Sequence, residues 1–219
     1  MLVSSGIGSP KIRSIVFDLG GVLVDWDPRY VYQQLIADHE EREWFLRECC
    51  SRDWILEQDL GRPWVEGNEI LIARYPEHRH LIEAFRERWL DMLRGPIAET
   101  VSLLGRLHQR NVPLYALSNW SADTFELSRD RLPFLSMFSG VLISGEVGIR
   151  KPDRRFFHIL GERYCVEPNT SVFIDDTKEN VDAAAALGFD AIHCISPAAL
   201  QHELERRGLL DTLHDDPQQ

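Results

Sequence analysis

The chain has 219 residues, 44% of them hydrophobic, and its formal net charge at pH 7 is −11. This length suits one α/β domain, or a core domain with a smaller insert, and the apolar content is enough for a real core. The acidic balance argues against a nucleic acid or an anionic membrane as partner, but not against a small phosphorylated ligand whose charge a bound cation offsets.

The first predicted element is a buried strand that ends on an acid. Residues 1–10 are rich in Gly and Ser and are expected to be a flexible terminus. Residues 15–17 form an apolar run typical of a strand buried on both faces, and Asp18, Gly20 and Gly21 follow it. An acid at the carboxyl end of such a strand, beside glycines that let the chain turn, is typical of the place where α/β proteins carry out chemistry.

Residues 28–94, called here the helical insert, differ in character from the rest of the chain. They are rich in Glu, Arg, Leu and Trp, and their apolar residues recur at helical spacing, as Leu81, Ile82 and Phe85 do. The segment shows no strand pattern. The sequence therefore predicts an all-helical insert of several short helices directly after the first strand.

Strands and helices alternate after the insert. This pattern predicts a Rossmann-like parallel sheet flanked by helices, with residues 11–27 and 95–213 as an α/β core, the insert as a helical cap, and residues 214–219 as a second flexible terminus. Strands are expected at residues 112–117, 140–144, 171–176 and 191–194, and helices at residues 100–110, 123–131, 152–164, 180–187 and 200–209.

The lack of long apolar runs and the spacing of the cysteines predict a soluble, cytoplasmic protein. No apolar run reaches membrane-spanning length, and the N-terminal residues lack the continuous apolar stretch of a signal peptide. Cys49 and Cys50 are adjacent, whereas Cys165 and Cys194 lie far apart without metal-ligand spacing. These four cysteines are therefore expected to be reduced thiols. The oligomeric state cannot be read from the sequence.

Polar side chains follow several of the predicted strands at the point where each ends. Asp18 and Ser118 come after two of them, Asp175 and Asp176 come after a third, and Lys151 opens the helix after another. Because the carboxyl ends of parallel strands share one edge of a sheet, these groups are expected to converge in one crevice. Clustered carboxylates with a hydroxyl and a lysine suit a phosphate group bound through Mg²⁺.

These segments resemble the four motifs of the haloacid dehalogenase superfamily of hydrolases. Asp18 matches the nucleophile of the first motif, Ser118 the second, Lys151 the third, and Asp175-Asp176 the fourth. The order and the strand contexts agree as well, and the resemblance covers about residues 12–209. The insert lies between the first and second motifs, where this superfamily carries its helical cap.

The resemblance implies a reaction and a set of site residues. Asp18 would attack phosphorus and form an aspartyl phosphate that water hydrolyses. Ser118 and Lys151 would contact the phosphoryl oxygens. Mg²⁺ would be held by Asp18, the Gly20 carbonyl, Asp175 and Asp176. Further candidates for substrate binding are Gly20, Gly21, Asn119, Trp120 and Arg150.

One position departs from the pattern of the phosphatases in this superfamily. They usually carry a second Asp, a general acid and base, two residues after the nucleophile, and here that residue is Gly20. Haloacid dehalogenases also lack this Asp and also carry Ser-Asn after the second strand, but they need no metal and typically do not keep the paired acids of the fourth motif. A branch of small phosphatases with an Asp-x-Gly-x-Val first motif, including sugar-phosphate phosphatases, has both features.

We therefore expect a Mg²⁺-dependent phosphomonoesterase acting on a small phosphorylated metabolite, with a sugar phosphate as one candidate. A metal-independent 2-haloacid dehalogenase and a non-catalytic phosphate- or metal-binding protein are the alternatives. Without an acid at Gly20, the rate is expected to depend on the leaving group's own stability, unless Asp25 or Asp27 supplies the proton. Residues that either face the substrate from the cap or simply pack there are Trp26, Asp27, Trp54, Gln58, Asp59 and Arg62.

Overall fold

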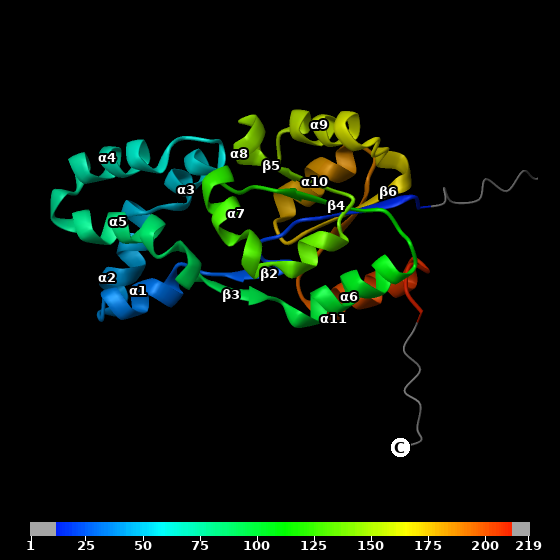
Figure 1. Ribbon diagram of the computed structural model, residues 1–219, viewed down its shortest axis with the longest axis horizontal. Coiled ribbons are helices and arrows are strands. Elements are labelled where there is room, and N and C mark those ends of the chain that lie inside the picture. The colour runs from blue at the N-terminus through cyan, green and yellow to red at the C-terminus, as the bar shows by residue number, and fades with distance from the viewer. Residues whose placement is uncertain (1–11, 212–219) are drawn as a thin grey trace, which may run out of the picture.

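The computed structural model describes residues 12–211, and the two expected flexible termini lie outside this range. It confirms an α/β fold built on a five-stranded parallel sheet with the strand order β5-β4-β1-β6-β7 (Figure 1). The strands are β1 (Ser14–Phe17), β4 (Leu114–Ser118), β5 (Gly140–Ile143), β6 (Ser171–Asp175) and β7 (Asp190–His193).

The first strand lies at the centre of the sheet and is buried on both faces. Ile15 and Phe17 belong to one apolar cluster, whereas Val16, between them, belongs to the other. Phe17 pairs with Ala116 on β4 and with Ile174 on β6. This register brings the carboxyl ends of the three strands to nearly the same level, which is the edge where the polar residues follow.

Helices cover both faces of the sheet, as Figure 1 shows. One face carries α6 (Ala98–Gln109) and α11 (Pro197–Arg206), whose leucines pack in the larger apolar cluster. The other face carries α9 (Arg154–Tyr164) and α10 (Lys178–Ala186), which contribute to the smaller cluster. The shorter helices α7 (Ala122–Ser128) and α8 (Ser144–Val147) lie beside the carboxyl edge.

The helical insert lies at one end of the sheet, on the left of Figure 1. Its helices surround an aromatic centre in which the Trp64 ring stacks on Phe85 with the centroids 5.9 Å apart. The same apolar cluster continues from the insert into the core, so the two are packed against each other. The insert comprises α1 (Arg29–Leu35), α2 (His39–Trp44), a π-helical turn (Phe45–Cys49), α3 (Arg52–Asp59), α4 (Trp64–Arg74), α5 (Arg79–Glu87) and the 3-10 turns Pro76–His78 and Trp89–Met92.

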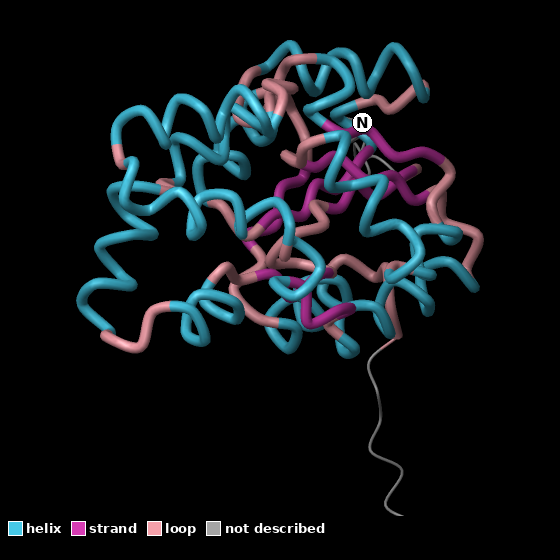
Figure 2. Tube along the Cα trace, turned by 60° about the vertical axis from the view of Figure 1, so that its left-hand side comes forward, coloured by secondary structure: helices cyan, strands magenta, loops and turns pink. Residues whose placement is uncertain are grey.

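The ends of the insert differ from the expectation of an all-helical segment. A two-stranded antiparallel ribbon, β2 (Val24–Trp26) paired with β3 (Leu93–Pro96), connects the insert to the core, and Figure 2 shows it apart from the main sheet. Residues 93 and 94 are therefore strand and not helix. Both strands are very short, and their register shifts between Asp25 and Trp26, so no alternation of apolar and polar residues marks them.

A second correction concerns the helix expected at residues 152–164. Helix α9 begins at Arg154, and the Asp153 side chain caps it by accepting a hydrogen bond from the Arg155 N–H at 2.9 Å. Lys151 thus does not open the helix. It lies in the turn before the helix, where its side chain can reach back over the sheet edge.

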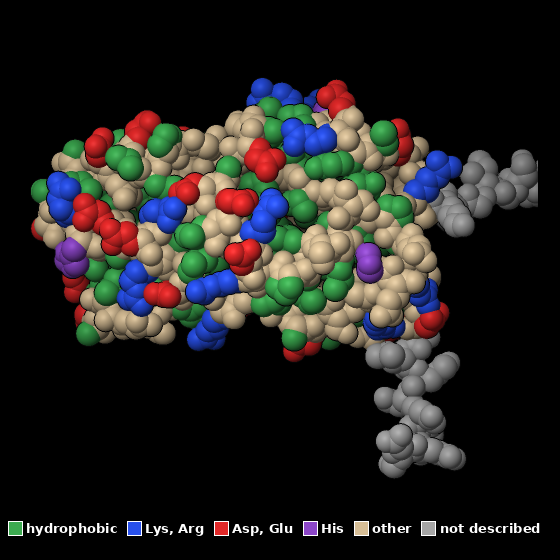
Figure 3. Space-filling model, in the orientation of Figure 1, with side chains coloured by type: hydrophobic (Ala, Val, Ile, Leu, Met, Phe, Trp, Pro, Cys, Tyr) green, Lys and Arg blue, Asp and Glu red, His purple; other side chains and the backbone are tan. Residues whose placement is uncertain are grey.

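Three further observations concern membrane-spanning helices, the cysteines and the surface charge. No helix among residues 12–211 is long and apolar enough to cross a membrane, and the four cysteines are free, as expected. On the face in Figure 3, lysine and arginine side chains are interspersed with acidic ones. The cytoplasmic location stays a prediction.

Candidate active site

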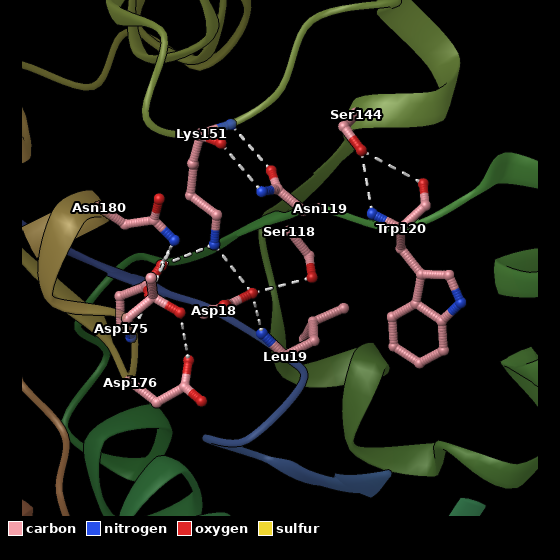
Figure 4. A network of polar contacts seen from close by, with 11 residues as sticks. Asp18, Leu19, Ser118, Asn119, Trp120, Ser144, Lys151, Asp175, Asp176 and Asn180 are labelled. Atoms are coloured by element: carbon pink, nitrogen blue, oxygen red, sulfur yellow. Dashed lines mark hydrogen bonds and ion pairs between the residues drawn. The ribbon is translucent and has the colours of Figure 1, made fainter. Parts of the chain in front are cut away.

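The groups expected at the sheet edge are together in the structure (Figure 4). Asp18 directly follows β1, and its Oδ1 atom accepts hydrogen bonds from the Leu19 N–H at 2.7 Å and the Ser118 hydroxyl at 2.9 Å. The Lys151 ammonium lies 2.9 Å from the same oxygen. Among residues 12–211, no hydrogen bond or ion pair is formed with Oδ2 of Asp18. One oxygen is thus anchored and the other is available for attack or for a cation.

Lys151 joins the first motif to the fourth. Its fully buried ammonium also lies 2.7 Å from Oδ2 of Asp175. The Asn119 amide orients the lysine, because its Nδ2 donates to the Lys151 carbonyl at 3.0 Å and its Oδ1 accepts from the Lys151 N–H at 2.8 Å. Asn119 therefore acts through the position of Lys151, which places the only buried cation of the described residues between two carboxylates.

Two residues that hold Asp175 were not expected from the sequence. The Thr177 N–H donates to Asp175 Oδ1 at 2.8 Å, and the Asn180 amide donates to the same oxygen at 3.0 Å. Thr177 is the N-cap of α10 and Asn180 lies in its first turn, so the helix start fixes the carboxylate at the end of β6. A helix start directly after two acids is the signal that would have pointed to both residues.

The site carries more negative than positive charge. Oxygen atoms of Asp18, Asp175 and Asp176 lie within 4.8 Å of one another, with Lys151 as their one close cation among the described residues. Burial raises the pKa of Asp18 to about 7, although Lys151 opposes the rise, and burial together with Asp175 raises the pKa of Asp176. An all-oxygen cluster that costs this much to ionise fits a hard divalent cation such as Mg²⁺.

The two glycines after Asp18 serve different purposes. Gly21 has a φ angle of +71°, and a Cβ atom there would lie 2.1 Å from Asp176 Oδ2, so any side chain would displace that acid. A Cβ atom at Gly20 would meet no atom within 4 Å, and its backbone is not left-handed. Gly21 is required for packing, whereas Gly20 leaves open space beside the nucleophile.

A cavity of about 460 Å³ opens over these groups, between the core and the helical insert. It adjoins a smaller pocket of about 90 Å³ with three indole rings in its wall, those of Trp26, Trp89 and Trp120. The larger cavity is lined by Asp18, Gly20, Trp26, Arg52, Ile55, Leu56, Asp59, Ser118, Asn119, Arg150, Lys151, Pro152, Thr177, Glu179 and Asn180. The smaller pocket shares Gly20, Trp26, Ile55, Asp59 and Asn119 with it.

The structure brings together most of the candidate site residues. Asp18, Gly20, Ser118, Asn119, Arg150 and Lys151 line the larger cavity, and Trp120 lines the smaller pocket. Asp175 and Asp176 are not in the wall of either. Asp175 is fully buried behind Lys151, and Asp176 contacts Gly21 in the same cluster.

The candidates from the insert and its connection divide into two groups. Trp26 and Asp59 line both the cavity and the pocket, whereas Asp27, Trp54, Gln58 and Arg62 line neither. Asp25 accepts a hydrogen bond from the Tyr30 hydroxyl at 2.8 Å, and Asp27 accepts one from the Arg29 N–H at 2.8 Å. Both acids thus have other partners outside the cavity, which speaks against either as the missing acid.

A family model described as haloacid dehalogenase-like hydrolase matches residues 12–188. The chain belongs to the haloacid dehalogenase-like hydrolases. It is accordingly an enzyme of the hydrolase class, as its sequence motifs indicate, and the matched range includes all four motifs.

Individual members of this hydrolase family resemble the chain to different extents. A sesquiterpene phosphatase of Aspergillus oryzae is 29% identical over 200 residues, which cover 89% of this chain and 95% of that protein. A phosphoserine phosphatase of Thermus thermophilus is 36% identical over 120 residues, covering 52% of this chain and 45% of that protein. A Bacteroides thetaiotaomicron enzyme of the family, solved with magnesium and inorganic phosphate, superposes with a TM-score of 0.64 at 23% identity, covering 83% of this chain and 93% of that one. This last likeness shows the fold.

Proposed function

We propose that the protein is a Mg²⁺-dependent phosphomonoesterase that hydrolyses a small phosphorylated metabolite through an aspartyl-phosphate intermediate. The observation that carries the proposal is the placement of Asp18, with one oxygen anchored and one available, at the floor of a cavity that also presents Ser118 and Lys151. The phosphatase names of the two relatives support the reaction class.

Each residue of this group has a role that follows from its contacts. Asp18 supplies the attacking oxygen, and the three donors on its other oxygen hold the carboxylate in one orientation. Lys151 lowers the repulsion between this carboxylate and the incoming phosphoryl group. Arg150, which also lines the cavity, is placed to donate to phosphoryl oxygens as charge develops on them, whereas the Ser118 hydroxyl would have to turn from Asp18 to do so.

Asp18, Asp175, Asp176 and the Gly20 carbonyl are the groups that would hold Mg²⁺. When bound, the cation would neutralise charge on the phosphoryl oxygens and hold them in position. The donor set supports this assignment, because hard divalent cations favour carboxylate and carbonyl oxygens and the cluster contains no sulfur or imidazole ligand among the described residues. We further propose that the helical insert is a cap over the catalytic core.

The smaller pocket indicates what the substrate carries besides phosphate. Its indole walls suit an organic group with an apolar face, such as the C–H face of a sugar or a short hydrocarbon chain. The Nε1 donors of Trp26 and Trp120 are buried and have no partner in the described part of the chain, and a small rotation of either indole on binding would let a hydroxyl or ether oxygen of the ligand supply one. A sugar phosphate thus stays a candidate substrate.

Phosphate release from a panel of phosphorylated metabolites, with Mg²⁺ and with a chelator, tests the proposal. Release that requires Mg²⁺ is the expected result. Gly20 and the Ser118-Asn119 pair are shared with haloacid dehalogenases, so chloride release from 2-chloropropionate is measured in parallel with the chelator present. Chloride release without metal would show that the protein is a dehalogenase and not a phosphatase. If neither phosphate nor chloride is released, a non-catalytic binding role is the remaining alternative.

A further inference from the structure

The cavity contains a carboxyl group to which neither the family motifs nor the roles above assign a function. Asp59 is the last residue of α3 and comes from the helical insert, yet it lines both the larger cavity and the smaller pocket beside Gly20. Gly20 is the position at which phosphatases of this superfamily usually carry their acid. Asp59 and Gly20 thus line the same cavity and the same pocket.

Asp59 is held against the core through its main chain. The Ser144 hydroxyl donates to the Asp59 carbonyl at 2.6 Å and accepts from the Trp120 N–H at 2.9 Å. Because Trp120 follows β4 and Ser144 follows β5, the end of α3 is connected to two strand ends of the core. The main chain of Asp59 is therefore fixed at the cavity although it comes from the insert, and the Ser121 N–H of the core contacts its carboxyl.

The surroundings of Asp59 suit a proton donor. Its side chain takes part in no ion pair with any described residue, and the residue is only 8% exposed. Burial raises the pKa of Asp59 to about 7, while the Ser121 N–H and the Arg150 guanidinium act in the opposite direction. A carboxyl with such a pKa is protonated in a substantial fraction of molecules near neutral pH, which is what acid catalysis needs.

Other acids near the cavity are less suitable. Asp18 is the nucleophile of the proposed reaction, and Glu179 is exposed to solvent. Glu146 on α8 pairs with Arg163 at 3.5 Å, and Asp123 on α7 pairs with Arg86 at 2.6 Å. The remaining charged groups in the wall of the larger cavity are cationic, namely Arg52, Arg150 and Lys151.

We propose that Asp59 is the general acid and base of this enzyme, in place of the acid absent at Gly20. The inference rests on the phosphatase function proposed above. In the first step the Asp18 oxygen bonds to phosphorus, the bond from phosphorus to the ester oxygen breaks, and the Asp59 carboxyl gives its proton to that departing oxygen. In the second step water bonds to phosphorus, the Asp59 carboxylate takes a proton from the water, and the bond to Asp18 breaks. Phosphate leaves, and both side chains return to their starting states.

The test compares Asp59→Asn with wild type on phosphate esters whose leaving groups differ in pKa. For simple alkyl phosphates we expect kcat/KM to fall by about 10²–10⁴-fold, the usual contribution of a positioned acid. For p-nitrophenyl phosphate, whose leaving group departs without a proton, the first step needs no acid, and we expect a much smaller loss. Asp53→Asn on the exposed face of the same helix is the matched control and is expected to leave both rates unchanged.

A merely structural role of Asp59 predicts a different pattern. Loss of its contact with Ser121 would lower the rates of both substrate classes alike, and the ratio of the two kcat/KM values would stay constant. A constant ratio overturns the proposal, whether or not the rates fall. Asp18→Asn is measured beside it, because activity that survives that change would overturn the phosphatase mechanism itself and not the role of Asp59.

Rescue and pH dependence give two independent readouts. A Cβ atom at Gly20 meets no atom within 4 Å, so a side chain fits there. In the Asp59→Asn background, Gly20→Asp is therefore expected to raise kcat/KM for alkyl phosphates more than for p-nitrophenyl phosphate. In wild type, the ratio of kcat/KM for alkyl phosphates to kcat/KM for p-nitrophenyl phosphate is expected to fall as the pH rises through about 7, since Asp59 then loses its proton. A ratio independent of pH would contradict the proposal even if Asp59→Asn failed to fold.

Discussion

The two sides of the candidate active-site cavity differ in how many of their polar groups have hydrogen-bond or ion-pair partners. On the core side, Asp18 and Asp175 each accept hydrogen bonds from several donors, and Lys151 contacts both. On the side of the insert and its connection, the Asp59 side chain has no ion-pair partner, and the indole N–H of Trp26 has no acceptor within the described range. On the core side these carboxylates are held in place before substrate arrives, whereas Asp59 and the Trp26 indole N–H on the other side lack such partners.

This difference indicates a division of labour. Fixed, fully hydrogen-bonded charges need no rearrangement when charge develops in the transition state, which favours catalysis on the core side. A buried polar atom without a partner costs free energy, and a bound ligand that supplies the partner recovers it. The insert side is therefore expected to determine which organic group binds, and changes on the two sides should have effects of different kind and size.

The largest effect is expected from Asp18→Asn on the core side. An amide of the same shape is a poor nucleophile, so kcat should fall by on the order of 10³-fold or more while the fold is kept. Steady-state kinetics measure the loss, and thermal unfolding checks the fold. Residual activity above about a tenth of wild type would rule out the assigned role.

Lys151→Met should have the next largest effect, on stability as well as on activity. Removing the cation leaves Asp18 and Asp175 buried together, and we expect a loss of about 3–5 kcal/mol in the free energy of unfolding at pH 8 without metal. Since the pKa of Asp18 is already raised in the folded state, and loss of the lysine raises it further, the defect should shrink as the pH falls and this carboxyl is protonated. Urea unfolding at pH 8 and pH 5.5 measures the difference, and an equal loss at both would contradict this explanation.

Asp175→Ala is expected to weaken Mg²⁺ dependence and activity together. It removes a carboxylate of the cluster, so the Mg²⁺ concentration for half-maximal activity should rise by at least about tenfold. Asp182→Ala, an exposed acid on α10 paired with Lys178, is the control and should leave the Mg²⁺ titration curve unchanged. A superimposable curve for Asp175→Ala would show that this residue does not hold the cation.

The smallest effect is expected from Trp120→Phe, in the wall of the smaller pocket. This change removes an unpartnered indole donor from the pocket wall, and a lost hydrogen bond to substrate corresponds to about 2–10-fold in KM. The effect should appear with substrates that carry an oxygen in the organic group and be absent with p-nitrophenyl phosphate. Trp44→Phe, which packs on Tyr75 away from the cavity, is the control. A change in kcat of equal size for both substrates would mean that Trp120 supports the catalytic groups instead.

The core half of the site follows from local sequence pattern. Asp18, Ser118 and Asp175 each stand at the end of an apolar run, and the topology of a parallel sheet places such ends on one edge whatever the intervening loops do. Even there, the sequence does not show that Gly21 has no room for a side chain while Gly20 does. That difference arises because Asp176, which is distant in sequence, lies against Gly21.

Which residues of the insert line the cavity depends on tertiary structure. The periodicity of α3 predicts a helix but not which of Trp54, Gln58 and Asp59 faces the cavity, because that depends on how the helix end packs on Ser144, which is 85 residues away from Asp59 in the chain. The β2-β3 ribbon was likewise invisible, since each short strand is formed only by pairing with the other across the whole insert. The sequence by itself determined which candidate catalytic groups converge at the sheet edge. Only the packing of the insert on the core determined that Asp59 lines the cavity beside them, because periodicity shows that a helix has an apolar face but not what that face packs against.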